Sequence, residues 1–433
     1  MISKSAQVTE AEYPLAEAVV PKGYKQTEVG LLPEDWQVKL LPDVCRFRGG
    51  KAHEQYISDS GRFVCVNSKF ISTNGAVRKY STANFCCAKR GDVLMVMSDL
   101  PNGQALAKAY LVDQDDLYAV NQRVCALTPY GHCSNYLFYA LNRNRYFLKF
   151  DDGVNQTHLL NPVFQKCPVP VPPTKAEQEA IAEALSDADA LIESLQHLIA
   201  KKCQIKQGTM QELLTAKNRL SGFSSEWEVK SLDDLFCFSG GLSASRDQLS
   251  SNGYCYLHYG DIHTSKKPFI DVRSEYWDIP KLDVPLKQVS RASLLDDGDV
   301  VFVDASEDDE GTSKHVVIVN TDRIPFISGL HTIVAKSKTN ALSHEYQRYC
   351  FQTPAVKGQF RFYAVGTKVS GISKTNIAKV TLLVPPLHEQ IAIASILSDM
   401  DAEIVVLEAK LTKTQQVKQG MMHELLTGRV RLV

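Results

Sequence analysis

Few side chains in this 433-residue chain occur in the combinations that catalysis requires. Glu408-Ala-Lys410, with Asp401 upstream, has the Glu-x-Lys spacing of nucleases, but it lies within a helical pattern, which favours ordinary surface charges. The phosphate-binding G-x-x-x-x-G-K-[ST] loop is absent from the sequence. The Asn/Asp-Pro-Pro-aromatic motif and Gly-rich cofactor loop of an adenine methyltransferase are absent as well. We therefore predict no catalytic residues.

Metal ligation is equally poorly supported. His132-Cys133 and Cys86-Cys87 lack the second ligand pair that a zinc site needs, so we interpret them as core or loop residues. The acidic segment Asp304–Glu310 lacks the glycine and the ligand spacing of a calcium loop. It would repel phosphate, and we expect it to point away from any nucleic acid. The sequence predicts no metal and no cofactor bound by this chain.

Composition restricts the class of protein further. The 11 cysteines include no CxxC pair, and no signal peptide precedes them, which favours free thiols in a reducing cytoplasm. No apolar run approaches the ~18 residues of a membrane span. Residues 22–170 carry 18 basic and 13 acidic side chains (+5), whereas residues 221–384 carry 18 and 20 (−2). A DNA-binding protein acting alone is usually more basic, so a partner would supply much of the phosphate affinity.

A duplicated segment must position whatever residues are functional. Residues 173–220 reappear without a gap as residues 385–432, with 25 of 48 aligned positions identical. In both copies apolar residues alternate in steps of four and three, which predicts a helix of about 40 residues, or roughly 60 Å, with a coiled-coil seam. The seam residues are Ile181, Leu185, Ala188, Ile192, Leu195 and Ile199, and then Ile393, Leu397, Met400, Ile404, Leu407 and Leu411.

Local signals mark the ends of these helices. Thr174 and Glu177 predict a capping box at the start of the first copy. The seam turns polar at Lys206 and Lys418, each just before a glycine, and there we expect both helices to fray or to change partner. One interpretation of the repeat is an antiparallel helical hairpin that only supports its own fold. Identity at polar positions outside the seam instead indicates two copies of one binding surface.

The globular segments are duplicated too. Glu34–Gly50 corresponds to Ser225–Gly241, and short strands are predicted at Phe63–Val66 and Tyr254–Leu257. Gly-Asp turns before buried strands recur at residues 91–96 and 298–303. The loops between these landmarks differ, as expected for two domains that recognise different targets, although unconstrained drift would have the same result.

Three sets of residues make this organisation specific: Gly23–Gly30 leading to Pro33–Trp36, the proline-rich runs Val169–Gln178 and Val384–Gln390, and Lys206–Thr215 with its second copy. On these residues, and over nearly its whole length, the chain resembles the specificity subunit of a type I restriction-modification enzyme. The resemblance implies an α+β fold with two globular target-recognition domains separated by two long helices packed as an antiparallel coiled coil. The implied boundaries are an N-terminal arm (1–22), target-recognition domain 1 (23–172), the family's central conserved helix (173–220), target-recognition domain 2 (221–384) and its C-terminal conserved helix (385–433).

The resemblance also implies a function. A non-catalytic, cytoplasmic subunit would recognise a bipartite double-stranded DNA site and dock two methyltransferase subunits, through which restriction subunits join. The partners would use S-adenosylmethionine, and ATP with Mg for restriction. The docking candidates are Gln178, Asp187, Gln207, Glu212, Gln390, Asp399, Gln419 and Glu424. If the helices set the distance between half-sites, lengthening both by one turn changes the spacer and leaves the half-site sequences unaltered.

Candidate DNA contacts are polar or basic residues after the short strands and in the divergent loops. Each of them alone is more often a solvated surface residue than a contact. In the first domain they are Arg46, Arg48, Lys51, Asn67, Ser68, Lys69, Arg78, Lys79, Tyr80, Asn121, Gln122, Arg123, Asn155, Gln156, Thr157 and His158. In the second they are Arg246, His258, Tyr259, His263, Lys266, Lys267, Lys314, His315, His331, Arg361 and Lys368. The alternative function is a coiled-coil adaptor that joins two protein partners without binding DNA; a degenerate enzyme is less favoured.

Overall fold

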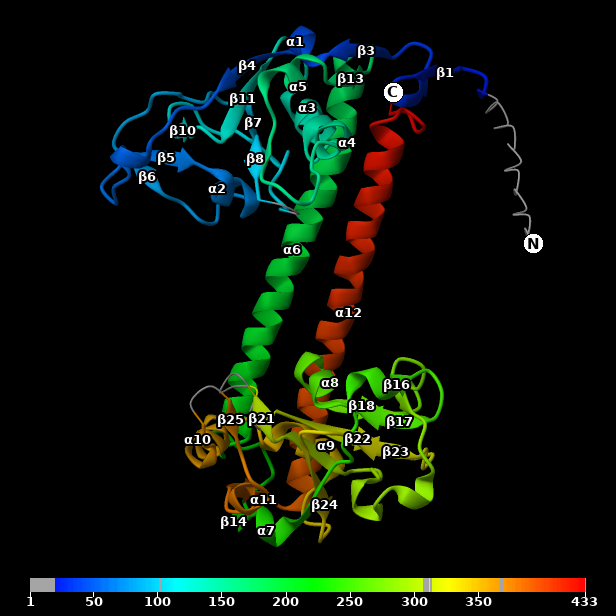
Figure 1. The fold of residues 1–433 in the computed structure, drawn as a ribbon. Coiled ribbons are helices and arrows are strands. Elements are labelled where there is room, and N and C mark those ends of the chain that lie inside the picture. Colours follow the sequence, from blue (N-terminus) through cyan, green and yellow to red (C-terminus); the bar gives the residue numbers. More distant parts are fainter. Residues whose placement is uncertain (1–19, 101–102, 307–310, 312–313, 367–368, 433) are drawn as a thin grey trace, which may run out of the picture. The chain divides into compact units, whose positions relative to one another are not determined.

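The computed structural model describes residues 20–100, 103–306, 311, 314–366 and 369–432. Of the N-terminal arm predicted at 1–22, residues 1–19 lie outside these ranges, as does most of the acidic segment after Ser306. The chain divides into two units: unit 1 comprises residues 1–196 and 410–433, and unit 2 comprises residues 197–409 (Figure 1). No helix of the described residues is long and apolar enough to cross a membrane.

Unit 1 is built on a four-stranded sheet of order β4-β11-β7-β9, joined by the three-stranded sheet β10-β5-β6 and three two-stranded ribbons, β1-β2, β3-β13 and β8-β12. Its elements are β1 (Tyr24–Thr27), β2 (Gly30–Pro33), β3 (Gln37–Leu40), α1 (Leu41–Val44), β4 (Cys45–Gly49), β5 (Phe63–Val66), α2 (Ser68–Ser72), β6 (Tyr80–Ser81), β7 (Val93–Val96), β8 (Ser98–Asp99), β9 (Ala109–Leu111), β10 (Tyr118–Val120), β11 (Val124–Pro129), α3 (Ser134–Leu141), α4 (Arg145–Leu148), β12 (Thr157–His158), α5 (Asn161–Gln165) and β13 (Pro168–Val171). The long helix α6 (Lys175–Leu213) follows.

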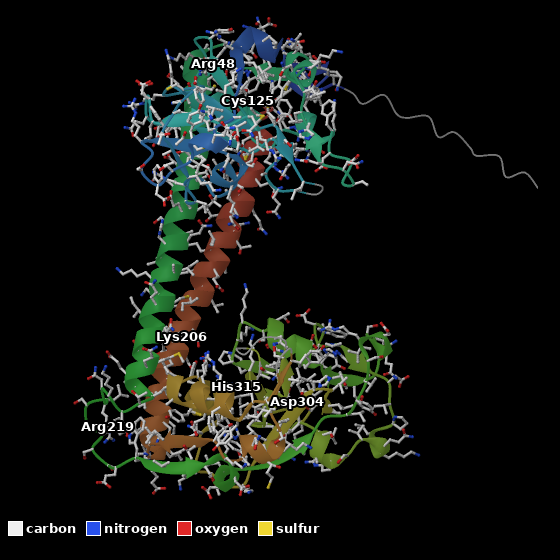
Figure 2. All side chains as sticks on the ribbon, turned by 60° about the vertical axis from the view of Figure 1, so that its left-hand side comes forward. Arg48, Cys125, Lys206, Arg219, Asp304 and His315 are labelled. Carbon is white, nitrogen blue, oxygen red and sulfur yellow. The ribbon has the colours of Figure 1, made fainter. Side chains whose placement is uncertain are left out.

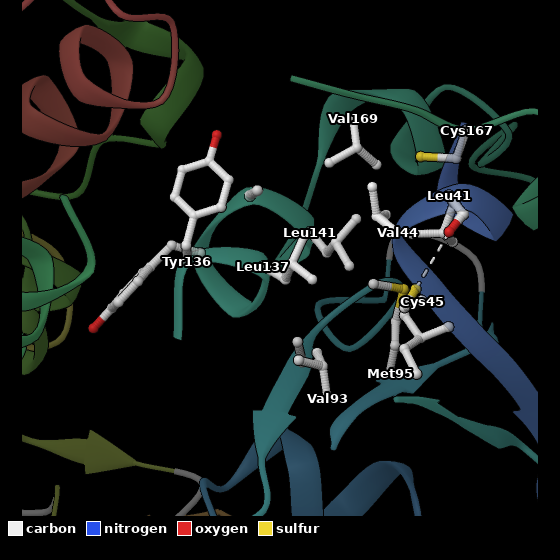
Figure 3. Packing of buried hydrophobic residues seen from close by; sticks show 14 of the residues in the cluster. Leu41, Val44, Cys45, Val93, Met95, Tyr136, Leu137, Leu141, Cys167 and Val169 are labelled. Atoms are coloured by element: carbon white, nitrogen blue, oxygen red, sulfur yellow. Dashed lines mark hydrogen bonds between the residues drawn. The ribbon is translucent and has the colours of Figure 1, made fainter. Parts of the chain in front are cut away.

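The four-stranded sheet of unit 1 separates two hydrophobic cores, because successive side chains of a strand point to opposite faces. Val93 and Met95 of β7 face the core that contains α1 and α3, whereas Leu94 and Val96 face the core under α2. Figure 3 shows the first of these cores, with Val93 and Met95 below Cys45 of β4. The first core is completed by Ile181, Ala182 and Leu185 of α6 and by Leu425 near the end of the chain.

Unit 2 repeats this plan with a five-stranded sheet of order β15-β24-β20-β22-β18, the four-stranded sheet β16-β19-β17-β23 and the ribbons β14-β26 and β21-β25. Its elements are β14 (Glu228–Ser231), α7 (Leu232–Leu235), β15 (Phe236–Gly240), β16 (Leu249–Ser250), β17 (Tyr254–Leu257), α8 (Tyr259–Thr264), β18 (Phe269–Asp271), β19 (Lys281–Leu282), β20 (Val300–Val303), β21 (Ala305–Ser306), β22 (His315–Val319), β23 (Phe326–Ser328), β24 (Thr332–Ser337), α9 (His344–Cys350), α10 (Pro354–Tyr363), β25 (Ser370–Gly371), α11 (Lys374–Ile377), β26 (Thr381–Val384) and α12 (Leu387–Leu425). Both pairs of strands predicted from the repeats are present: β5 and β17, and β7 and β20.

Within each unit the two long helices run antiparallel, as their ion pairs show. In unit 1, Asp189 of α6 pairs with Lys418 of α12 at 2.5 Å, and Glu177 pairs with Arg431 beyond the end of α12. Residue numbers thus rise along one helix while they fall along the other. Unit 2 has the matching pairs Lys206–Asp401 and Arg219–Glu389. The predicted fold class, including the antiparallel coiled coil, is confirmed.

The prediction that the helices fray at the polar part of the seam is wrong. Helix α6 continues through Gly208 to Leu213, and α12 continues through Gly420 to Leu425. The helices do change partner there, because Leu213 and Leu214 of α6 pack in the core of unit 2 and Leu425 of α12 packs in the core of unit 1. The Lys206 ammonium pairs with Asp401, whose other carboxylate oxygen accepts a hydrogen bond from the Tyr349 hydroxyl at 2.8 Å. The Lys206 charge is neutralised by Asp401, and Asp401 also accepts a hydrogen bond from a hydroxyl, so these charged groups do not interrupt the helix.

The predicted capping box is half correct. The Thr174 hydroxyl accepts a hydrogen bond from the Glu177 backbone N–H at 3.1 Å, as an N-cap should. The Glu177 carboxylate is only 1% exposed and binds the Arg431 guanidinium instead of the Thr174 backbone. The tertiary ion pair replaces the local hydrogen bond because a guanidinium binds a buried carboxylate through two N–H groups and also supplies its countercharge.

Candidate nucleic-acid interface

In unit 1 the strongest group of predicted DNA contacts gathers at one edge of the fold. Strands β5 and β10 are parallel, with Val66 opposite Val120, so their carboxyl ends lie at the same edge. Asn67 to Lys69 follow β5 directly, and Asn121 to Arg123 follow β10. Lys51 joins them, because its backbone pairs with Asn121. Polar side chains from three separate segments are thereby brought together.

Unit 2 forms the same edge from β17 and β23, which are also parallel, with Leu257 opposite Ser328. His258 and Tyr259 follow β17, and His331 precedes β24. Arg123 and His331 occupy equivalent positions, since their carbonyls accept the backbone N–H of Met97 and of Asp304, respectively. The sequence repeat alone did not align these two residues.

Several residues of this edge already serve the fold of unit 1. The Asn67 side chain caps α2 through the Phe70 N–H at 2.9 Å, and the Ser68 hydroxyl is buried with no hydrogen-bond partner among the residues that the structure describes. Asn121 is buried, and Gln122 donates to Glu54 at 2.5 Å. The hydrogen bond from Gln122 is the main reason that the pKa of Glu54 lies below its usual value. Sequence reasoning missed this carboxylate, which holds the turn after β10.

Arg48 lies in the globular part of unit 1 (Figure 2), and its side chain binds groups of its own domain. Its guanidinium binds the buried Asp92 carboxylate at 2.5 Å and the Cys87 carbonyl at 2.8 Å. Asp92 belongs to the repeated Gly-Asp turn, so Arg48 neutralises a carboxylate that is only 1% exposed. Removing Arg48 would leave that charge buried and unpaired. The structure therefore gives Arg48 a role in stability, and we do not propose it as a DNA contact.

Unit 2 also uses several candidates internally. The Lys314 ammonium donates to the His263 and Ser265 carbonyls at the end of α8, at 2.6 and 3.1 Å. Lys108, which was not predicted, does the same for the Ser72 carbonyl at the end of α2. Lys108 directly precedes β9 and Lys314 directly precedes β22, the strands that pair with β7 and β20 after the two Gly-Asp turns. This shared position in the repeat could have identified the two lysines as a structural pair. Lys314 is thus not proposed as a phosphate contact.

Three further candidates of unit 2 are engaged or buried. Arg246 pairs with Asp261 at 3.0 Å. The His258 ring caps α8 through the Gly260 N–H, and burial, followed by the charge of Arg246, lowers its pKa. His315 is buried against the rings of Phe302 and Phe351, so it is a core residue rather than a contact. Lys368 lies outside the described residues.

Other candidates lie on the surface but apart from the two edges. Arg46 is at the opposite end of β4 from Gly49, and Arg78 and Lys79 lie before β6. Asn155 bonds to Asp152, Gln156 bonds to Ser98, and Thr157 is buried. At the two edges and elsewhere together, the candidates with exposed side chains are Arg46, Lys51, Lys69, Arg78, Lys79, Tyr80, Gln122, Arg123, Asn155, Gln156, His158, Arg246, Lys266, Lys267, His331 and Arg361. None of these contacts is tested by the structure, and they stay predictions.

The predicted docking residues divide into two classes. Gln178 is 4% exposed and accepts a hydrogen bond from the Cys133 N–H at 3.0 Å, and Gln390 is 0% exposed and accepts one from the Ser343 N–H at 2.9 Å. These two glutamines join each long helix to its own domain, so burial removes them as docking candidates. Asp187, Gln207, Glu212, Asp399 and Gln419 are exposed, and Glu424 is half-buried beside Arg429.

Comparison with known proteins agrees with this duplicated plan. The model of the family described as the type I restriction modification DNA specificity domain matches residues 33–201 and 224–419. The chain belongs to this family. The type I restriction enzyme MjaX specificity subunit of Methanocaldococcus jannaschii is 24% identical to this chain. The alignment covers 95% of this chain and 97% of that subunit. The MjaVIII specificity subunit of the same organism is 21% identical, over 95% and 96%.

Solved structures of the specificity-subunit family share the fold. The S subunit of a type I restriction-modification system from M. genitalium superposes with a TM-score of 0.56, covering 90% of this chain and 96% of its own, at 13% identity. A chain from a structure on complex assembly and conformational transition of a type I system gives a TM-score of 0.54 and covers 92% of this chain and 99% of its own, at 14% identity. At such low identity the likeness establishes the fold of a specificity subunit and not its contacts.

Proposed function

We propose that this chain is the non-catalytic specificity subunit of a type I restriction-modification complex and recognises a bipartite double-stranded DNA site, one half with each unit. The observation that carries the proposal is the duplication: two family domains share one sheet plan, and in both a parallel strand pair ends in an edge of polar side chains. The residues differ at equivalent positions, such as Arg123 and His331. Two similar domains with different edge residues suit two different half-sites.

We further propose that two methyltransferase subunits dock on the helices and that restriction subunits join through them. Support comes from the exposed residues shared by both helix copies, Asp187 with Asp399 and Gln207 with Gln419. The partners would bring S-adenosylmethionine, and ATP with Mg for restriction. Net charge supports this division of work: at −1 for the chain, phosphate affinity must come largely from partners.

Methylation mapping tests the proposal. Genomic adenine methylation is mapped in cells that express the partner methyltransferase with and without this chain. We expect methylation at a two-part sequence with a fixed spacer, present only with the chain. Binding of the purified complex to that site should weaken steeply with added salt, because phosphate contacts release counterions. A complex that forms with its partners but shows no site-specific, salt-dependent binding would instead support the protein-adaptor function.

A further inference from the structure

Beside the polar edge of unit 1 lies an exposed aromatic pair, Tyr56 and Phe85, which is not among the predicted DNA contacts. The two ring centroids are 4.9 Å apart in an edge-to-face arrangement, and the Phe85 ring also lies 5.3 Å from the ring of His53. Phe85 is 52% exposed and Tyr56 is 41% exposed. A single apolar side chain on a surface is ordinary, but two large rings that pack together and stay exposed indicate a binding surface.

The fold holds the aromatic pair at the carboxyl end of β10. The Val120 N–H of β10 donates to the Cys86 carbonyl at 2.8 Å, so Phe85 lies next to the end of this strand. The buried His53 ring fixes it there, because Nε2 accepts the Phe85 backbone N–H at 3.1 Å and Nδ1–H donates to the Lys51 carbonyl at 2.6 Å. Since Lys51 is itself a residue of the edge, the aromatic pair and the edge form one surface.

The charge beside the aromatic pair favours contact with bases over contact with phosphates. Glu54 begins the short helix that ends at Tyr56, and its carboxylate accepts hydrogen bonds from Gln122 and Asn121 of the edge. This carboxylate would repel a phosphate, whereas the exposed cations of the edge suit one. The apolar group that base pairs present in the major groove is the C5-methyl group of thymine. An aromatic surface next to hydrogen-bonding side chains therefore fits a thymine.

Unit 2 differs from unit 1 at the same place. The short helix that follows β15 there is Arg246–Gln248, which contains only polar residues. Leu249 and Leu286 near it are partly buried against a hydrophobic cluster that includes Tyr256 and Leu282. An exposed aromatic pair is thus a feature of unit 1 at this position, as expected if the two half-sites place thymine differently.

We propose that Tyr56 and Phe85 determine specificity in unit 1 by packing against the C5-methyl group of a thymine in its half-site. The inference rests on the proposed function and deepens it, because it names a chemical group of the DNA that unit 1 recognises. Polar side chains of the edge bind hydrogen-bonding groups of the bases, and the aromatic pair recognises the methyl group. Unit 1 therefore distinguishes thymine from uracil, which differ only in this group.

Base analogues test the proposal in the assembled complex of this chain with its methyltransferase. Each thymine of the mapped site is replaced in turn by uracil in synthetic duplexes, and fluorescence anisotropy measures Kd. At a thymine in one half-site, loss of the methyl group should weaken binding about fourfold, the effect of removing one buried methyl-sized group from an apolar contact. 5-Bromouracil at the same position should restore binding, because bromine is similar in size to a methyl group.

Matched variants connect the methyl group to the aromatic pair. Phe85→Ala and Tyr56→Ala should each weaken binding of the thymine duplex about fourfold, and uracil should then cause little further loss, because both changes remove the same contact. Phe150 is an exposed aromatic residue of the same unit, with its ring 5.7 Å from that of Tyr146, and Phe150→Ala should keep the full effect of uracil.

Three results contradict the proposal or its basis. If no thymine is sensitive to uracil, or if the uracil effect is unchanged in Phe85→Ala and Tyr56→Ala, the inference is overturned. If these variants weaken assembly with the methyltransferase and leave the uracil effect intact, the aromatic pair contacts a protein and the inference is also overturned. Loss of specific binding by the unaltered complex overturns the proposed function instead.

Discussion

The ion pair between Arg431 and Glu177 predicts that unit 1 depends on the last residues of the chain. The Glu177 carboxylate is 1% exposed, and Arg431 binds it through Nε and through Nη2, the latter at 2.9 Å. Two carboxylates, Glu177 and then Asp35, raise the pKa of Arg431. Arg431→Met leaves Glu177 buried without its countercharge. Breaking a buried pair in this way costs about 3–5 kcal/mol, and because Arg431 is 29% exposed we expect about 3 kcal/mol.

For a unit of about this size, 3 kcal/mol lowers Tm by roughly 9 °C. Differential scanning calorimetry measures this change, and hydrogen exchange with mass spectrometry locates it. Exchange should increase in the peptides of unit 1 around Trp36 and the start of α6, and not in β14 or β26 of unit 2. Arg429→Met is the matched control, because Arg429 is an exposed residue that pairs with Glu424 at 3.6 Å and should change stability by less than about 0.5 kcal/mol.

Charge removal separates the ion pair from simple packing. If the cost arises from an unpaired buried charge, adding Glu177→Gln to Arg431→Met should recover about half of the lost Tm, since a neutral amide costs less to bury than a carboxylate. The reasoning is refuted if Arg431→Met changes Tm by no more than Arg429→Met does, or if exchange rises equally in both units.

The remaining predictions concern other contacts of the fold. Burial lowers the pKa of His315 to about 4 from its ordinary 6.5. The stability that this neutral ring contributes is therefore fully present above pH 6.5 and is lost as pH falls toward 4. In denaturant titrations, His315→Phe should reduce the change in the unfolding free energy of unit 2 across this pH range by up to about 3 kcal/mol. The Lys418 ammonium lies 2.5 Å from the Asp189 carboxylate, so Lys418→Glu places two carboxylates together and should lower the free energy of unfolding by about 2 kcal/mol. Adding Asp189→Lys should restore at least half of this loss. No recovery in the double variant would mean that the pair is not specific. Gly298→Ala should destabilise unit 2 by more than about 1 kcal/mol, because φ of Gly298 is +79° and a Cβ there would lie 2.1 Å from the His344 ring. Gly358 lies in the interior of α10 with open space around it, so Gly358→Ala should stabilise unit 2 by up to about 1 kcal/mol. Melting curves that rank the two variants the other way contradict this argument.

Local pattern was enough to predict the elements that carry the site. The step of four and three residues places one apolar face on each long helix, and short apolar runs after glycine predict strands, so α6, α12, β5 and β17 follow from neighbours in the sequence. Duplication added the two-domain plan, and the quoted motifs identified the family. The sequence also indicated that polar residues directly follow the strands, but the parallel pairing of β5 with β10, which brings them to one edge in unit 1, was seen only in the structure.

The sequence did not determine which polar side chains remain available. Arg48, Gln178, Gln390 and Lys314 are residue types that commonly contact DNA or a partner, but the groups they bind lie 44 to 51 residues away along the chain. Only the folded chain brings these groups together. A coiled-coil seam is also compatible with either direction of the second helix. Ion pairs between residues 195 and 254 positions apart, Lys206 with Asp401 and Glu177 with Arg431, favour the antiparallel arrangement. Helices and strands are thus encoded by nearby residues, whereas pairing of charges depends on the tertiary fold.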